Sequence, residues 1–312
     1  MERRATLDLG TNTFHLLIAE VENCQIQSIL VDEKRAVKIG AGGINQGFIT
    51  DEAIQRAIVT FKEYKQIIEQ YAVNDVVAIA TSAFRCANNG LEVAEILYKE
   101  SGIKIQIIDG EKEALLIHKG VMLAYTPLNN NALIVDIGGG SVEFVICNET
   151  TIHFKQSFEI GGLRMLELFQ KSDPISIEDT QKLIDYLTDK LQPLQLAVNQ
   201  HKPTIMVGAS GAYDTILEMV YAQYGLPLTN AAAFQIDISD FKKLHQQLRY
   251  LNRTERLALP GMIPLRVDMI VVACILINYL IDIYQIGSLV NIRYALKEGA
   301  IVDDKLFSKN EK

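Results

Sequence analysis

Residues 8–15 read DLGTNTFH and residues 136–143 read DIGGGSVE, and the likeness of these two stretches decides the fold. An aspartate begins each stretch, a glycine follows two positions later, and Thr13 in the first corresponds to Ser141 in the second. Apolar residues on both sides predict a strand, a tight turn and a second strand in each case. The sequence therefore contains an internal repeat, with a hairpin opening each half.

The elements around the two hairpins alternate between strand and helix. In the first half we expect strands at 26–31, 75–80 and 103–108, and helices at 51–71 with a Thr50 cap, 91–101 and 111–123. In the second half we expect strands at 151–158 and 204–207, and helices at 164–170, 177–198, 213–223, 239–250 and 267–284. Residues 125–131, with Pro127 and successive asparagines, are the best candidate boundary. This order predicts an α/β layer in each half.

Length and composition narrow the class of protein. A chain of 312 residues favours two domains, and its net charge of -8 argues against a nucleic-acid or membrane partner. The four cysteines have no zinc spacing, and the longest apolar run, 269–281, is too short to span a membrane. The N-terminus lacks the pattern of a signal peptide, so we expect a cytoplasmic protein. Apolar helices in the second half could support a homodimer.

Both hairpin turns suit phosphate binding. Glycine lets backbone N–H groups approach an anion closely, and a hydroxyl beside the turn adds a further donor. Either turn alone is more typical of an ordinary hairpin than of a phosphate site. Their recurrence at matching places in two α/β halves favours a phosphate site in a cleft. The predicted phosphate-binding residues here are Gly10, Thr11, Asn12, Thr13, Gly138, Gly139, Gly140 and Ser141.

Several stretches together resemble one family. Residues 8–16 (DLGTNTFHL), 81–85 (TSAFR), 109–114 (DGEKEA), 136–143, 160–164 (IGGLR) and 207–211 (VGASG) are similar to successive motifs of the exopolyphosphatase and guanosine pentaphosphate phosphohydrolase family. The resemblance implies an α/β fold of two ribonuclease-H-like (actin-like ATPase) domains with an interdomain cleft. With the boundary at 125–131, we expect an N-terminal lobe of residues 1–124 plus 298–312, and a second, more helical lobe of residues 125–297.

Phosphoanhydride hydrolysis needs a hard cation and a positioned water, and three acids are candidates for these roles. Asp136 and Glu143 flank the second turn and suit Mg²⁺ or another divalent cation, with Asp8 as a further predicted ligand. A turn-capping role for Asp136 and an exposed strand position for Glu143 are the alternatives. The resemblance assigns Glu113 to the acid that orients or activates the attacking water. An acid in a first helical turn also stabilises the helix dipole.

Arginines and a third glycine turn complete the predicted site. Arg85 follows a buried strand at its carboxyl end, where α/β proteins bind ligands, and Arg266 is a second candidate. Either arginine is equally typical of a surface side chain. Residues 208–212 read GASGA, which fails the nucleophile-elbow pattern because Ala212 replaces its last glycine. We therefore expect Gly208, Ser210 and Gly211 to form a phosphate-binding turn at a helix N-terminus.

The leading hypothesis is Mg-assisted hydrolysis that releases terminal phosphate from inorganic polyphosphate or from guanosine pentaphosphate. An ATP-dependent phosphotransferase of the sugar or acetate kinase type is a second hypothesis. A non-catalytic sensor of guanosine tetraphosphate or polyphosphate is a third. The three acids argue against a sensor, because a pure binder of polyanions gains nothing from clustered negative charge.

Overall fold

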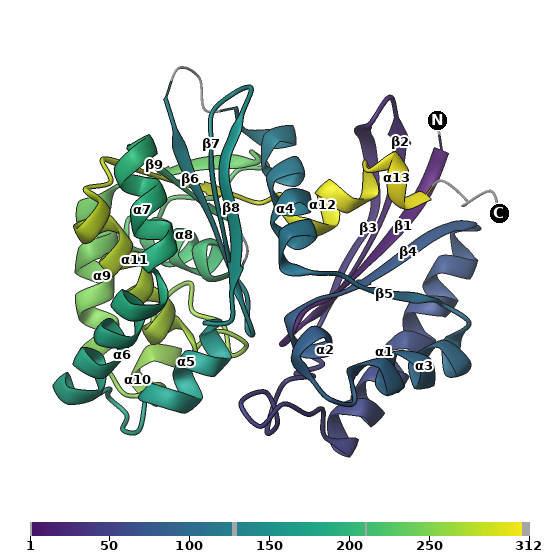
Figure 1. Cartoon of the computed structure of the whole chain (residues 1–312), viewed down its shortest axis with the longest axis horizontal. Helices are drawn as coiled ribbons and strands as arrows, with labels where there is room; N and C mark the ends of the chain where they lie inside the picture. The colour runs from purple at the N-terminus through teal and green to yellow at the C-terminus, as the bar shows by residue number, and fades with distance from the viewer. Residues whose placement is uncertain (1, 127–129, 210, 308–312) are drawn as a thin grey trace. The chain divides into compact units, whose positions relative to one another are not determined.

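The computed structural model describes residues 2–126, 130–209 and 211–307, which form two compact units. Unit 1 contains the chain up to Leu123, the short stretch Gly138–Gly140 and the chain from Ala295 onward. Unit 2 contains Ala124–Ile137 and Ser141–Tyr294. Each unit is built on its own β-sheet (Figure 1) and has its own hydrophobic core.

Unit 1 contains a five-stranded sheet with the order β3-β2-β1-β4-β5. Its strands are β1 (Glu2–Leu9), β2 (Phe14–Glu22), β3 (Gln25–Arg35), β4 (Asp75–Ala80) and β5 (Ile105–Ile107). The first three strands form an antiparallel meander, whereas β4 and β5 run parallel to β1. Parallel neighbours need crossover connections, and helices provide them here.

Helices cover both faces of this sheet (Figure 1). They are α1 (Asp51–Gln70), α2 (Ser82–Cys86), α3 (Gly90–Ser101), α4 (Gly110–Ala124), α12 (Leu296–Ile301) and α13 (Asp304–Phe307). Leu16 and Ile18 of β2 belong to the core that α1, α2 and α3 share. Leu17 and Ala19 pack instead with Ile301 of α12. Successive side chains of a strand point to opposite faces, so β2 is buried from both sides.

Helix α1 begins where the sequence predicts. The Thr50 hydroxyl accepts a hydrogen bond from the Ala53 amide at 3.3 Å, as an N-cap residue should. Asp51 and Glu52 occupy the first turn, where negative charge is favourable. The expected helix over 51–71 with a Thr50 cap is confirmed.

Unit 2 repeats the same topology in a six-stranded sheet with the order β10-β11-β9-β6-β7-β8. Its strands are β6 (Ala132–Ile137), β7 (Val142–Cys147), β8 (Ile152–Phe158), β9 (Ile205–Ala209), β10 (Ala233–Ile236) and β11 (Ser288–Ile292). Strands β6, β7 and β8 form an antiparallel meander, and β9 and β11 follow in parallel. The α/β fold of two ribonuclease-H-like units is therefore confirmed.

Unit 2 is rich in helices, most of which flank its sheet (Figure 1). They are α5 (Gly162–Phe169), α6 (Ile177–Lys190), α7 (Gln192–His201), α8 (Gly211–Gln223), α9 (Ile238–Tyr250), α10 (Arg253–Leu257) and α11 (Ile270–Tyr284). Helix α11 is buried along most of its length, which explains its apolar sequence. No helix in the described part of the chain is both long enough and apolar enough to cross a bilayer.

Two features of unit 2 differ from the sequence prediction. The single helix expected over 177–198 is divided, because α6 ends at Lys190 and α7 begins at Gln192. Pro193 explains the break, since proline lacks an N–H group and is accommodated at the start of a helix. Strands β10 and β11 were not expected from the sequence. They extend the sheet beyond β9, with β10 antiparallel at the edge.

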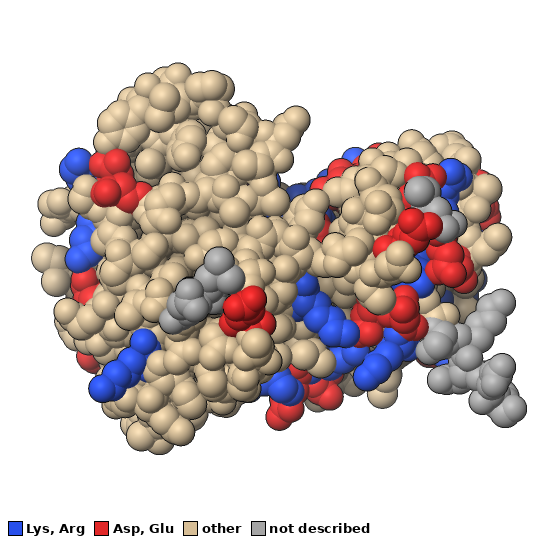
Figure 2. All heavy atoms as spheres, turned by 90° about the horizontal axis from the view of Figure 1, so that it is seen from above, with Lys and Arg blue, Asp and Glu red and all other residues tan. Residues whose placement is uncertain are grey.

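Side chains of both charge signs are mixed over unit 1 in the view of Figure 2. Among the ion pairs of this unit, Arg4 contacts Glu2 at 2.7 Å and Asp304 at 2.8 Å. The Arg4 guanidinium also lies over the Phe307 ring, 4.7 Å from its centroid. These contacts attach α13 to β1 and so fix the end of the described chain against the sheet.

Candidate functional site

The turn between β1 and β2 contains Gly10, Thr11, Asn12 and Thr13, and it is held by the loop that follows β3. The Lys38 amide donates to the Asn12 carbonyl at 2.8 Å, and the Gly40 amide donates to the Thr11 carbonyl at 3.0 Å. Thr11 and Asn12 are both buried. The turn therefore has a fixed conformation at the end of β1, where Asp8 lies opposite His15 in the strand register.

The stretch Gly138–Gly140 groups with unit 1, and two of its glycines lie against polar side chains there. A Cβ atom at Gly139 would lie 2.9 Å from Asn12 Nδ2, which is closer than real Cβ contacts allow. A Cβ atom at Gly140 would overlap the Ser82 hydroxyl. Both positions therefore need glycine for close backbone approach, whatever ligand the turn binds.

Arg85 and Glu113 form a close ion pair within unit 1. Arg85 Nη1 donates to Glu113 Oε2 at 2.7 Å and to the Ile108 carbonyl at 3.2 Å. Glu113 is buried in the first turn of α4, and Arg85 lies in the last turn of α2, the short helix after β4. The sequence identified both residues separately but gave no sign that they pair. The arrangement fixes the orientation of the Glu113 carboxylate.

The position of α4, and hence of Glu113, is supported from the C-terminal part of unit 1. Asp303 is buried and accepts hydrogen bonds from Lys112 at 3.0 Å and from Lys119 at 3.1 Å. Burial raises the pKa of Asp303, but these two ammonium groups outweigh burial and hold that pKa below its ordinary value. Asp303 therefore stays charged at neutral pH and links two turns of α4.

In unit 2, Asp136 and Glu143 lie directly opposite each other on the antiparallel strands β6 and β7. Both side chains are buried. Side chains of directly opposed residues lie on the same face of a sheet, and like charges in this arrangement are destabilising. Ser157 of β8 donates its hydroxyl to Glu143 Oε1 at 2.6 Å, which orients that carboxylate. The geometry gathers negative charge that a cation would stabilise. Ser141, which directly precedes β7, is also buried.

Arg266 lies against the first residue of α8. A Cβ atom at Gly211 would overlap the Arg266 guanidinium, so glycine is required for this contact. Burial lowers the pKa of Arg266, while Asp214 and Asp136 act in the opposite direction. Arginine nevertheless stays protonated in proteins. The structure therefore gives unit 2 a fixed positive charge among acids at the start of α8.

Gly208 has a packing role that the sequence did not indicate. The ring of Tyr213 lies where a Cβ atom at Gly208 would be, and Tyr213 is fully buried. On the neighbouring strand, Asn291 pairs with Gly208 in the register and donates to Asp214 Oδ1 at 3.2 Å. Asn291 was not identified from the sequence because β11 was not predicted, and its pairing with Asp214 in α8 was therefore missed. Ser210, the predicted donor of this turn, lies outside the described residues.

The predicted metal site depends on two carboxylates. Among the described residues, no group of three or more His, Cys, Asp or Glu side chains could hold a metal ion. Mg²⁺ commonly uses one or two protein carboxylates together with waters and substrate oxygens. Asp136 and Glu143 fit that smaller requirement, whereas Asp8 belongs to unit 1. A divalent cation therefore remains a prediction for this chain.

Comparison with known families gives one match across most of the chain. A model of the Ppx/GppA phosphatase family matches residues 17–307. A bifunctional 3-dehydroquinate synthase/phosphatase from Fusobacterium nucleatum is 30% identical, and the alignment covers 90% of this chain and 43% of that protein. The chain thus spans less than half the length of this curated relative.

Solved structures give the same result. A crystal structure of an exopolyphosphatase from Cytophaga hutchinsonii has 40% sequence identity to this chain and a TM-score of 0.93. The alignment covers 97% of this chain and 98% of that chain. A Ppx/GppA family member from Aquifex aeolicus has 24% sequence identity and a TM-score of 0.81, and the alignment covers 100% of this chain and 99% of that chain. The first similarity extends to sequence and fold, and the second shows the fold.

Proposed function

The chain belongs to the Ppx/GppA phosphatase family, and on this premise we propose that it is a phosphohydrolase. Its proposed reaction is the release of terminal phosphate from inorganic polyphosphate or guanosine pentaphosphate, with water as the acceptor. The similar Cytophaga hutchinsonii protein is named an exopolyphosphatase, which favours polyphosphate as the first substrate to test.

The opposed pair Asp136 and Glu143 carries this proposal. Two buried carboxylates on one sheet face repel a polyanion unless a cation lies between them and the phosphate oxygens. When bound, Mg²⁺ or another divalent cation would neutralise phosphate oxygens and the charge that develops in the transition state. Ser157 would keep Glu143 oriented toward such a cation through its 2.6 Å hydrogen bond.

Glu113 is the proposed acid for the attacking water. Its carboxylate is buried and is held by Arg85, so the group is oriented before substrate arrives. An oriented carboxylate can align a water for in-line attack and accept its proton as the phosphorus–oxygen bond forms. The leaving phosphate takes the electrons of the broken anhydride bond. Arg85 would also place its positive charge beside the phosphate group that the water attacks.

Turn amides and Arg266 are the proposed contacts to the rest of the substrate. Backbone N–H groups of the two glycine turns can donate to phosphate oxygens without bringing further charge. Arg266 offers a permanent positive charge at the start of α8.

The test is a phosphate-release assay with polyphosphate, guanosine pentaphosphate and ATP, each with and without Mg²⁺. The decisive variant is Glu113→Gln, with Glu111→Gln as the matched control, since Glu111 is an exposed acid in the same helical turn. We expect Glu113→Gln to lower kcat by about 100-fold or more, because a positioned acid or base contributes that much, and Glu111→Gln to change it less than about twofold.

Other results would support a different function. Phosphate transfer from ATP to an added acceptor, with no release from polyphosphate, would indicate a phosphotransferase. Tight binding of guanosine tetraphosphate or polyphosphate without turnover would indicate a sensor. Unchanged turnover in Glu113→Gln would remove the proposed role of that residue.

A further inference from the structure

The backbone that carries Arg266 belongs to an irregular connection between α10 and α11. The Arg266 and Val267 amides donate to the Ile263 carbonyl at 3.0 and 3.2 Å, and the Arg266 carbonyl accepts from the Ile270 amide at the start of α11 at 3.0 Å. No strand ladder fixes a segment of this kind. The start of α11 therefore holds the carbonyl side of Arg266, and side-chain contacts from other elements add to this support.

Arg256 of α10 makes such a contact next to Arg266. It is 1% exposed, and its Nε donates to the Val267 carbonyl at 3.3 Å. Its Nη1 donates to the Leu251 carbonyl at 2.6 Å and to Asp173 Oδ1 at 2.7 Å. One buried guanidinium thus connects the residue after Arg266 to the loop between α5 and α6.

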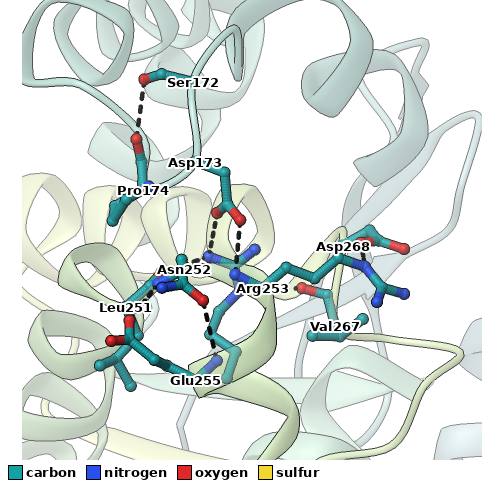
Figure 3. A network of polar contacts seen from close by, with 10 residues as sticks. Ser172, Asp173, Pro174, Leu251, Asn252, Arg253, Glu255, Val267 and Asp268 are labelled. Atoms are coloured by element: carbon teal, nitrogen blue, oxygen red, sulfur yellow. Dashed lines mark hydrogen bonds and ion pairs between the residues drawn. The ribbon is translucent and has the colours of Figure 1, made fainter.

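Asp173 uses its second oxygen in the same network. Asp173 Oδ2 accepts a hydrogen bond from the Arg253 amide at 2.6 Å (Figure 3). Arg253 Nε in turn donates to Asp268 Oδ1 at 2.7 Å. Asp173 therefore secures the first turn of α10 and the charge of Arg256 together. We refer to Asp173 and Arg256 as the clamp.

The Arg266 side chain has little support of its own. Its Nε is buried and has no hydrogen-bond partner among the residues that the structure describes. Its guanidinium is placed by contact with Gly211 and by the charges of Asp214 and Asp136. A small shift of the backbone at Val267 would move the guanidinium away from Gly211, because no side-chain bond at Nε opposes the shift.

We propose that Asp173 and Arg256 are positioning residues that hold Arg266 at the start of α8 for binding of substrate phosphate. The inference rests on the proposed function, in which Arg266 is a phosphate contact. It assigns a role in substrate binding to a loop residue, Asp173, that lies 83 positions before Arg256 in the chain. The clamp acts through Arg266 and needs no contact with substrate.

The kinetic test is a double-mutant cycle between the clamp and Arg266, with tripolyphosphate and long polyphosphate as substrates. We expect Asp173→Asn to raise KM about tenfold with a smaller effect on kcat, since the misplaced group binds substrate. In an Arg266→Ala background, Asp173→Asn should change KM less than about twofold, because residues that act as a unit are not additive. Equal effects of Asp173→Asn in both backgrounds would overturn the proposal, as would an unchanged KM in Arg266→Ala.

Two further variants separate positioning from general instability. Asp173→Asn leaves the buried Arg256 guanidinium without its carboxylate partner, which is destabilising in itself. The double variant Asp173→Asn/Arg256→Met removes both charges and avoids this cost. It should show the same rise in KM. Asp268→Asn is the control, because it breaks an ion pair on the same segment whose side chains are 50% and 43% exposed. We expect Asp268→Asn to leave KM within about twofold of the wild type.

Amide hydrogen exchange tests the clamp without any activity. Asp173→Asn should increase exchange in residues 258–270 by about tenfold, while β6 and β9 stay protected. Unchanged exchange in 258–270 would overturn the inference even if activity changed. If the wild type releases no phosphate from any substrate, the proposed function fails, and the exchange result still decides whether the clamp holds this segment.

Discussion

Substitution of Gly299 by alanine should destabilise unit 1, because α12 lies too close to α4 for a methyl group. A Cβ atom at Gly299 would overlap the Leu116 carbonyl of α4, and one at Gly120 would overlap the Ala295 carbonyl before α12. The overlapping atoms belong to backbone and cannot rotate away. Overpacking lowers the free energy of unfolding by about 1–3 kcal/mol, and the upper end applies because the overlap is with backbone. The better helix propensity of alanine offsets about 1 kcal/mol of this loss.

The net cost for Gly299→Ala is therefore about 2 kcal/mol in the free energy of unfolding, or a fall of about 4–8 °C in Tm. Thermal unfolding measures it, with Gly287→Ala as the control. The nearest atom to a Cβ at Gly287 is the Thr204 carbonyl oxygen at 3.7 Å, an ordinary contact. A Gly299→Ala variant as stable as wild type would refute the close crossing. We also expect lower kcat in this variant, since α4 carries Glu113.

Further predictions concern the stability of unit 2. Burial lowers the pKa of His245 to about 4. As the pH falls, this imidazole therefore becomes protonated in the unfolded chain before it does in the native protein. The contribution of neutral His245 to the free energy of unfolding should be complete above about pH 6.5 and should fall by about 2 kcal/mol at pH 5. Urea unfolding at pH 7 and at pH 5 measures this difference. The variant His245→Gln should lose most of the pH dependence of stability. Gly208→Ala should displace the Tyr213 ring and lower the free energy of unfolding by about 2 kcal/mol, whereas unchanged stability would show that the ring has room to move.

The meander at the start of each unit could be predicted because its signals are local. Alternating apolar residues and a glycine turn specify β1–β2 and β6–β7 within a few residues, so the sequence alone placed Asp136 and Glu143 on a common hairpin. Strand β11 carries no such signal. Its five residues follow a long buried helix, and their pairing with β9 is a contact between distant parts of the chain.

Side-chain partners were harder to predict than elements for the same reason. Arg85 and Glu113 are 28 positions apart, and Arg256 and Asp173 are 83 apart. Each residue type has many possible partners at such separations, and only tertiary packing selects one. The sequence could therefore identify candidate acids and arginines by their place relative to strand ends. It could not show that Arg85 orients Glu113 or that Asp173 secures the segment of Arg266.

The repeat also shows why a cation should prefer one unit. Asp8 and Asp136 occupy corresponding positions at the ends of β1 and β6, but their opposed partners differ, since Asp8 lies opposite His15 and Asp136 lies opposite Glu143. His15 makes a contact of 3.2 Å with the Thr13 hydroxyl and offers nitrogen, whereas Mg²⁺ prefers oxygen ligands. Only the hairpin of unit 2 presents two opposed carboxylates. We therefore expect Asp136 and Glu143 to provide the main cation contacts.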